Sequence, residues 1–180
     1  MPTKSKAPKF TPEQVKEHIK NIAKAVEKHK KENKEKYFDA ITPEQIEEKL
    51  KRVNSPIINS LAYGPSTPGG TLNFSVGVYN PDPVSFSSLF VNTFVGTGNI
   101  DPDLGTFLLN VDTRFARLTA PASSGGQTLA PSASAIFSYS LSVPATIEKT
   151  TYMVNACLFK RGWFETGTFF DRASFAMVVS

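Results

Sequence analysis

The sequence has almost no cysteine and no long apolar run. It contains one cysteine, Cys157, so no disulfide can form within the chain. This fits a reducing compartment, although many exported β domains also lack disulfides. No stretch approaches the roughly 18 consecutive apolar residues of a membrane-spanning helix, so we expect no transmembrane segment. The opening residues, MPTKSKAPKF, hold no apolar run and do not resemble a secretory signal. Localisation stays unknown: we expect cytoplasmic synthesis, with release or assembly outside the cell left open.

Histidine is also scarce, and its placement argues against catalysis. His18 and His29 both fall in a helical N-terminal segment rather than beside the serines of the later part, so no Ser–His–Asp order is visible. They share one helix face but lie about 16 Å apart, too far to bind one metal ion. We predict that both are solvated. Since no glycine-rich phosphate loop precedes a helix either, we expect no enzyme and no cofactor.

Basic residues are unevenly distributed along the chain. Residues 1–52 hold 14 Lys and Arg against 9 Asp and Glu, a net charge of +5, whereas residues 53–180 hold 6 against 7, a net charge of −1. Glutamates interleave with the lysines of the first helix and form i, i+4 pairs such as Glu27–Lys31. No aromatic residues alternate with these lysines, as single-strand binding would require. We therefore expect a solvated face and no nucleic-acid partner.

A repeated decapeptide predicts where two helices begin. TPEQVKEHIK starts at Thr11 and TPEQIEEKLK at Thr42. In each copy the threonine is a good N-cap, the proline fits the first helical turn, and the glutamine completes a capping box. Helices are expected at about 12–36 and about 43–53, ended by Pro56. Shared capping chemistry explains the two copies better than a duplicated repeat unit does, because two copies fall short of a solenoid.

The first helix carries a narrow apolar stripe that must be covered. Its members share one face at helical spacing: Val15, Ile19, Ile22 and Val26. The stripe could pack on the second helix, on the following β domain, or on another chain. We expect another chain, because the polar stretch 28–36 would direct the helix away from its own domain. The stripe is therefore a candidate interaction site.

The pattern changes after a turn-rich stretch. Residues 63–71 contain YGPSTPGG and read as a linker. Beyond it, apolar and polar residues alternate, as at 72–78 and 135–143, which predicts half-buried antiparallel strands. No helix separates these strands, so a β-sandwich is favoured over a parallel sheet. The expected fold is α+β by segment: a basic helical arm at 1–62, the linker, and an all-β antiparallel sandwich at 72–180.

The β part resembles a known class of domain. Its opening strand closes on Asn80 and Pro81, TLAPSASAIFSYSLSVP from Thr128 is similar to an edge strand after a proline turn, and TYMVNACLF from Thr151 to a penultimate strand. Residues 72–180 resemble an immunoglobulin-like sandwich of the bacterial adhesion-module type, with Tyr152 at the place of a corner tyrosine. The cysteine pair of antibody domains is absent, and the fold implies no activity.

An acidic stretch at residues 99–103 and the single cysteine could each have either a functional or a purely structural role. Asn99, Asp101 and Asp103 alternate like calcium ligands, but the pattern departs from an EF-hand and equally suits a turn, so we expect no metal. Cys157 lies in mid-strand and is predicted to be a small packed residue.

FKRGWF, at residues 159–164, is the strongest candidate surface in the β part. A hairpin tip there would place Trp163 and Phe164 beside Lys160 and Arg161, a composition typical of binding hot spots. Both rings could instead fold under the end of the sandwich. We expect a non-enzymatic structural or interaction protein that associates with itself or docks into a larger assembly, as a surface, coat, filament or virion component. The alternative is a monomeric module that binds a protein or glycan through its end loops.

Overall fold

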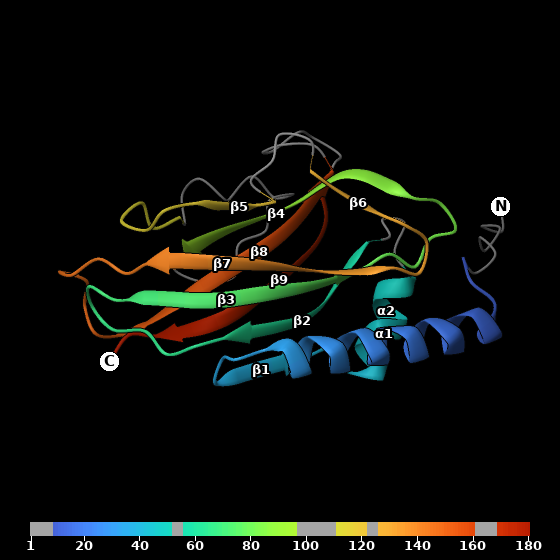
Figure 1. Cartoon of the computed structure of the whole chain (residues 1–180), viewed down its shortest axis with the longest axis horizontal. Coiled ribbons are helices and arrows are strands. Elements are labelled where there is room, and N and C mark those ends of the chain that lie inside the picture. The colour runs from blue at the N-terminus through green and yellow to red at the C-terminus, as the bar shows by residue number, and fades with distance from the viewer. Residues whose placement is uncertain (1–8, 52–55, 97–110, 122–125, 161–168) are drawn as a thin grey trace, which may run out of the picture.

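The computed structural model describes residues 9–51, 56–96, 111–121, 126–160 and 169–180 (Figure 1). These residues form two helices and nine strands: α1 (Pro12–Glu32), β1 (Tyr37–Ala40), α2 (Pro43–Leu50), β2 (Ile57–Tyr63), β3 (Thr71–Tyr79), β4 (Phe86–Gly96), β5 (Leu118–Ala120), β6 (Gln127–Leu129), β7 (Ser134–Ser142), β8 (Thr151–Lys160) and β9 (Phe169–Val178). A helix pair followed by antiparallel sheets confirms the predicted α+β class.

Both helices begin where the decapeptides predict. The Oγ1 atom of Thr11 accepts a hydrogen bond from the N–H of Gln14 at 3.2 Å, and the Gln14 side chain accepts from the N–H of Thr11 at 2.8 Å. Thr42 and Gln45 form the same reciprocal pair at the same distances. Each box satisfies two N–H groups that no helical carbonyl could reach.

The first helix is shorter than the sequence suggested. It ends at Glu32 rather than near Lys36, because the Asn33 side chain accepts from the N–H of Glu35 at 2.7 Å and so turns the chain out of the helix. The residues that follow form β1. The second helix ends at Leu50, and Val53 lies outside the described residues.

The strands form two antiparallel sheets. In the first sheet the order is β1-β2-β3-β7, and in the second it is β5-β4-β8-β9 with β6 also paired to β4. Apolar side chains of the two sheets form a common core. The Tyr139 hydroxyl of β7 donates to the carbonyl of Val91 on β4 at 2.7 Å and links the sheets. The hydroxyl of Tyr152 donates to the carbonyl of Glu148 at 3.0 Å, the bond that a corner tyrosine makes.

The boundary between arm and sandwich differs from the expectation. Residues 57–62, assigned to the arm, belong to β2, which pairs with β3 along its length. The stretch 63–71 therefore joins two neighbouring strands of one sheet instead of linking two parts of the chain. It is held at Gly69, whose N–H donates to the carbonyl of Val143 at 3.0 Å.

The apolar stripe of α1 is also placed differently. It packs within its own chain: Ile22 is fully buried in a cluster with Ile46, Leu50, Ile57 and Tyr79, and the cluster also contacts Val15, Ile19 and Val26. The expected packing on a neighbouring chain was therefore wrong. Figure 1 shows α1 and α2 together beside β1 and β2. Because β2 carries the core on one face and the helices on the other, α1 covers the outer face of the first sheet.

Candidate interaction surfaces

The C-terminal end of the α1 interface with the first sheet is polar. His29 is 2% exposed, and both of its ring nitrogens are bonded. Its Nδ1 lies 2.7 Å from the Oγ atom of Ser60 on β2, and its Nε2 lies 2.7 Å from the Oγ atom of Ser75 on β3. The ring of Phe38 on β1 packs against it edge to face at 5.3 Å. One histidine thus ties α1 to three strands.

The hydrogen bonds around His29 run in one direction. The Ser60 hydroxyl donates to Oδ1 of Asn59 at 2.7 Å, so the Ser60 oxygen is left to accept from Nδ1–H of His29. Nε2 then accepts from the Ser75 hydroxyl. The chain ends at Nδ2 of Asn59, which is buried and has no hydrogen-bond partner.

Gly77 makes room for this cluster. A Cβ atom at residue 77 would come closest to Oγ of Ser60, and it would lie 2.5 Å from Oδ1 of Asn59 and 3.0 Å from Nδ1 of His29. A small cavity of about 160 Å³ opens beside these groups under α1. Residue 77 must therefore lack a side chain while Ser60, Asn59 and His29 keep these positions.

His18 fastens the N-terminal half of α1. Its Nδ1 lies 3.0 Å from the hydroxyl of Tyr79, which is fully buried, and its ring packs edge to face on Phe10 at 4.9 Å. Burial lowers the pKa of His18, while the carboxylates of Asp82 and Glu17 act in the opposite direction. Burial also lowers the pKa of His29, opposed by Glu32. Both histidines are therefore held as neutral rings.

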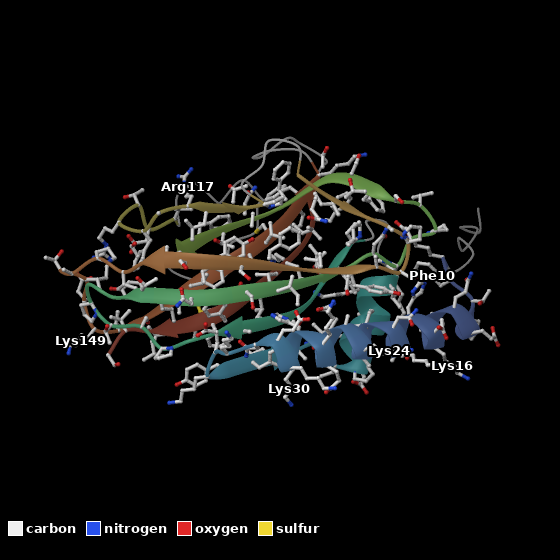
Figure 2. All side chains as sticks on the ribbon, viewed as in Figure 1. Phe10, Lys16, Lys24, Lys30, Arg117 and Lys149 are labelled. Atoms are coloured by element: carbon white, nitrogen blue, oxygen red, sulfur yellow. The ribbon has the colours of Figure 1, made fainter. Side chains whose placement is uncertain are left out.

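The prediction that both histidines are solvated was wrong. Residues 15, 18, 22, 26 and 29 follow one another at intervals of three and four, so the histidines continue the apolar stripe. That spacing was the available signal. The lysines, by contrast, point outward: Figure 2 shows Lys16, Lys24 and Lys30 directed away from the sheet.

His29 and Ser75 also form a base–hydroxyl pair, the first element of nucleophilic catalysis. A groove of about 330 Å³ lies beside them, lined in part by Asn73, Ser138 and Ser140. Acyl transfer further needs N–H donors aimed at a developing oxyanion. On the described strands next to Ser75, the backbone is engaged in the pairing of β3 with β2 and β7. The arrangement therefore supports a structural contact more directly than a catalytic one.

The edges of the two sheets differ in how they are protected. β1 is four residues long and carries Asp39, while β9 carries the charged residues Asp171 and Arg172. β5 and β6 have three residues each. β7 is nine residues long, reads SAIFSYSLS, and holds no charge, proline or glycine. Short, charged or proline-containing edges resist pairing with other chains, so β7 is the least protected edge of the described strands.

The far side of β7 has no strand partner among the described residues. Its one ladder is with β3, in unbroken register from Ser134 opposite Tyr79 to Ser142 opposite Thr71. β5 approaches β7 from the second sheet, but its hydrogen bonds go to β4. Four serines of β7 lie on the outer face of the first sheet and are exposed: Ser134, Ser138, Ser140 and Ser142.

The remaining candidate residues have mixed outcomes. Asn99, Asp101 and Asp103 lie outside the described residues, as do Arg161, Trp163 and Phe164; Lys160 is the last residue of β8. Cys157 is fully buried between Phe94 and Phe159, as predicted.

In the part of the chain that the structure describes, the His, Cys, Asp and Glu side chains form no group of three that could hold a metal ion. None of the helices in this part of the chain is long and apolar enough to span a membrane.

Comparisons with known proteins bear on the fold. No protein-family model matches the sequence, and no curated protein matches it. The crystal structure of the C-terminal domain of Wzt is similar, with a TM-score of 0.51 and 14% identity over 82% of this chain and 80% of that one. A CARDB domain of the PF1109 protein from Pyrococcus furiosus has a TM-score of 0.42 and 12% identity over 70% and 86%. The chain contains an immunoglobulin-like β-sandwich. At such identities the likeness extends to the fold alone.

Proposed function

We propose that this chain is a non-enzymatic structural protein that pairs with a second copy of itself along the free edge of β7, in the manner of the adhesion-type modules that its strand pattern resembles. The observation that carries the proposal is the nine-residue edge Ser134–Ser142, with which no described strand pairs on the side away from β3. A regular strand with unpaired backbone groups is a ready template for another strand. A second copy is the occupant that the sequence of β7 favours.

The strand is compatible with pairing to itself. In an antiparallel pair centred on Ser138, this residue faces Ser138 of the second copy, and Ser140 faces Ile136. No two charges meet, and hydroxyl side chains make favourable cross-strand pairs. Such an isologous contact closes on itself, so it predicts a dimer with one continuous sheet across both copies.

Charge at the centre of the edge tests the proposal. Ser138→Lys places two like charges opposite each other in the dimer, which should raise the dissociation constant at least roughly fivefold, or about 1 kcal/mol. Ser138→Glu should do the same. Mixing the two variants should restore association, because opposite charges then face each other. Sedimentation velocity over a range of concentrations measures all three states.

The matched control is Thr71→Lys. Thr71 is exposed on β3, opposite Ser142 and one strand inside the edge, so a lysine there should leave the dimer intact. A wild-type chain that stays monomeric at every concentration would overturn self-association and favour the monomeric binding module. An oligomer that Ser138→Lys leaves unchanged would place the contact elsewhere than β7.

A further inference from the structure

His29 lies in a neutral environment on the sheet side. The groups that face it from the strands carry no charge: Phe38 on β1, Ser60 and Asn59 on β2, and Ser75 on β3. The charged groups near it lie on α1, namely Glu32 and Lys28, and in the connection that follows α1, where Lys34 and Glu35 line the same groove as His29.

His18 has a different environment. A carboxylate from the opposing side of its interface, Asp82 in the β3–β4 turn, favours its charged form, as does Glu17 on α1, while Lys9 opposes it. A proton on His18 therefore meets a partner across the interface, but a proton on His29 does not.

We propose that α1 is an acid-opened latch: a proton taken up by His29 releases the C-terminal half of α1 from β2 and β3, while the sandwich core stays folded. His29 can take up the proton while α1 is still docked. The hydroxyl oxygen of Ser75, which donates to the neutral ring, can instead accept from the protonated ring, and the Ser60 oxygen accepts in both states. The closed state is disfavoured because it would bury a positive charge among neutral groups.

The surrounding structure allows this opening to be local. The core between the sheets is a separate cluster that contains no residue of α1. The stripe of α1 packs instead on Ile57 and Tyr79, on the outer face of the first sheet. Opening of the C-terminal half would leave Tyr79 bonded to His18, and it would give Nδ2 of Asn59, buried and unpaired when the latch is closed, access to water.

The direction of the pH effect follows from the lowered pKa of His29. The free side chain titrates at 6.5 and the docked one below that value. The stability of docking is therefore fully present above about pH 6.5 and is lost as the pH falls toward the pKa of the docked ring. At a pH below both pKa values, the equilibrium constant for docking of α1 is lowered about tenfold for each pH unit between the pKa of the free ring and that of the docked ring.

Residue-resolved hydrogen exchange of the isotope-labelled chain can follow the latch. The measured quantity is the protection of the amides of residues 24–31 relative to those of β8, at about pH 7.5 and about pH 5. In the wild type this ratio should fall between the two pH values, by at most about tenfold for each pH unit that separates the pKa of the docked ring from that of the free ring. In His29→Gln, which keeps a donor and an acceptor but cannot titrate, it should stay constant. In the matched variant His18→Gln it should fall as in the wild type.

Two results would overturn the latch. One is a wild-type ratio that does not change with pH, which would mean that α1 opens only when the whole chain unfolds. The other is an equal fall in His29→Gln, which would assign the acid response to carboxylates. If His29→Gln does not fold, NMR titration of the wild-type imidazole decides: a pKa of His29 at or above 6.5 refutes the proposal.

Discussion

Replacing Asp171 should destabilise the whole chain, because its carboxylate joins three elements. Oδ2 of Asp171 on β9 accepts from Nζ of Lys49 on α2 at 2.6 Å and from the N–H of Ile58 on β2 at 2.8 Å. Nζ of Lys49 also donates to the carbonyl of Ile58 at 2.9 Å. The side chains of Asp171 and Lys49 are 1% and 11% exposed, so water screens the pair little.

The expected loss in the free energy of unfolding depends on which buried groups each substitution leaves without their present partner. Asp171→Ala removes the carboxylate oxygen that accepts from both the ammonium of Lys49 and the N–H of Ile58. Both donors then lose this acceptor in a buried site. Breaking a buried ion pair on one side costs about 3–5 kcal/mol. Lys49→Met removes the Lys49 ammonium from the buried carboxylate and should cost a comparable amount. The double variant Lys49→Met/Asp171→Ala leaves neither charge, so it should cost less than the two single changes added together, by about 1–3 kcal/mol.

Urea denaturation gives the free energy of unfolding for all four chains. The matched control is Asp39→Ala, which removes an exposed carboxylate bonded to the hydroxyl of Tyr63 at 2.8 Å and should cost less than about 1 kcal/mol. A loss below about 1 kcal/mol for Asp171→Ala would refute the reasoning. So would single and double variants that add within about 0.5 kcal/mol, since that would mean the pair is not coupled.

Two further predictions concern the N-terminal part. Thr42→Ala removes the cap of α2 and should lower the free energy of unfolding by about 1 kcal/mol, measured in the same urea titration; an unchanged value would mean that the capping box does not stabilise the native state. Deleting residues 1–60 should abolish cooperative unfolding, because it removes most of β2 and leaves Asp171 without Lys49 and Ile58. A truncated chain that melts cooperatively would instead support the independent sandwich that the period change at 63–71 suggested.

Local signals in the sequence predicted well, and long-range ones did not. The capping boxes at Thr11 and Thr42 were identified because all their atoms lie within four residues of one another. β1 was missed because a four-residue strand next to a polar stretch is specified by its pairing with β2, which no local pattern reveals. β2 itself was missed because α1 covers one of its faces and the core the other, so nearly all its residues are buried and none of the expected alternation appears.

The candidate sites were limited in the same way. Cys157 was placed correctly because a cysteine inside an alternating strand is ordinarily packed. His29 was judged from its lysine-rich neighbours, whereas its position is determined by serines 31 and 46 residues further along the chain. The β7 edge could not be recognised before the strand order was known, because whether a strand is internal or terminal depends on every other strand.

Gly77 has a consequence for the history of this chain. Its missing side chain is needed while Ser60, Asn59 and His29 occupy the space beside it. Removing the ring at residue 29 alone would leave the two nearest side chains, Ser60 and Asn59, in place. Among descendants of the same ancestor, residue 77 should therefore gain a side chain only where residues 59 and 60 have also changed. A position 77 that varies freely while Asn59 and Ser60 are retained would be hard to reconcile with this close approach. Linked substitution at 77, 59 and 60 would thus be a trace of the packing under α1 that can be read from sequences alone.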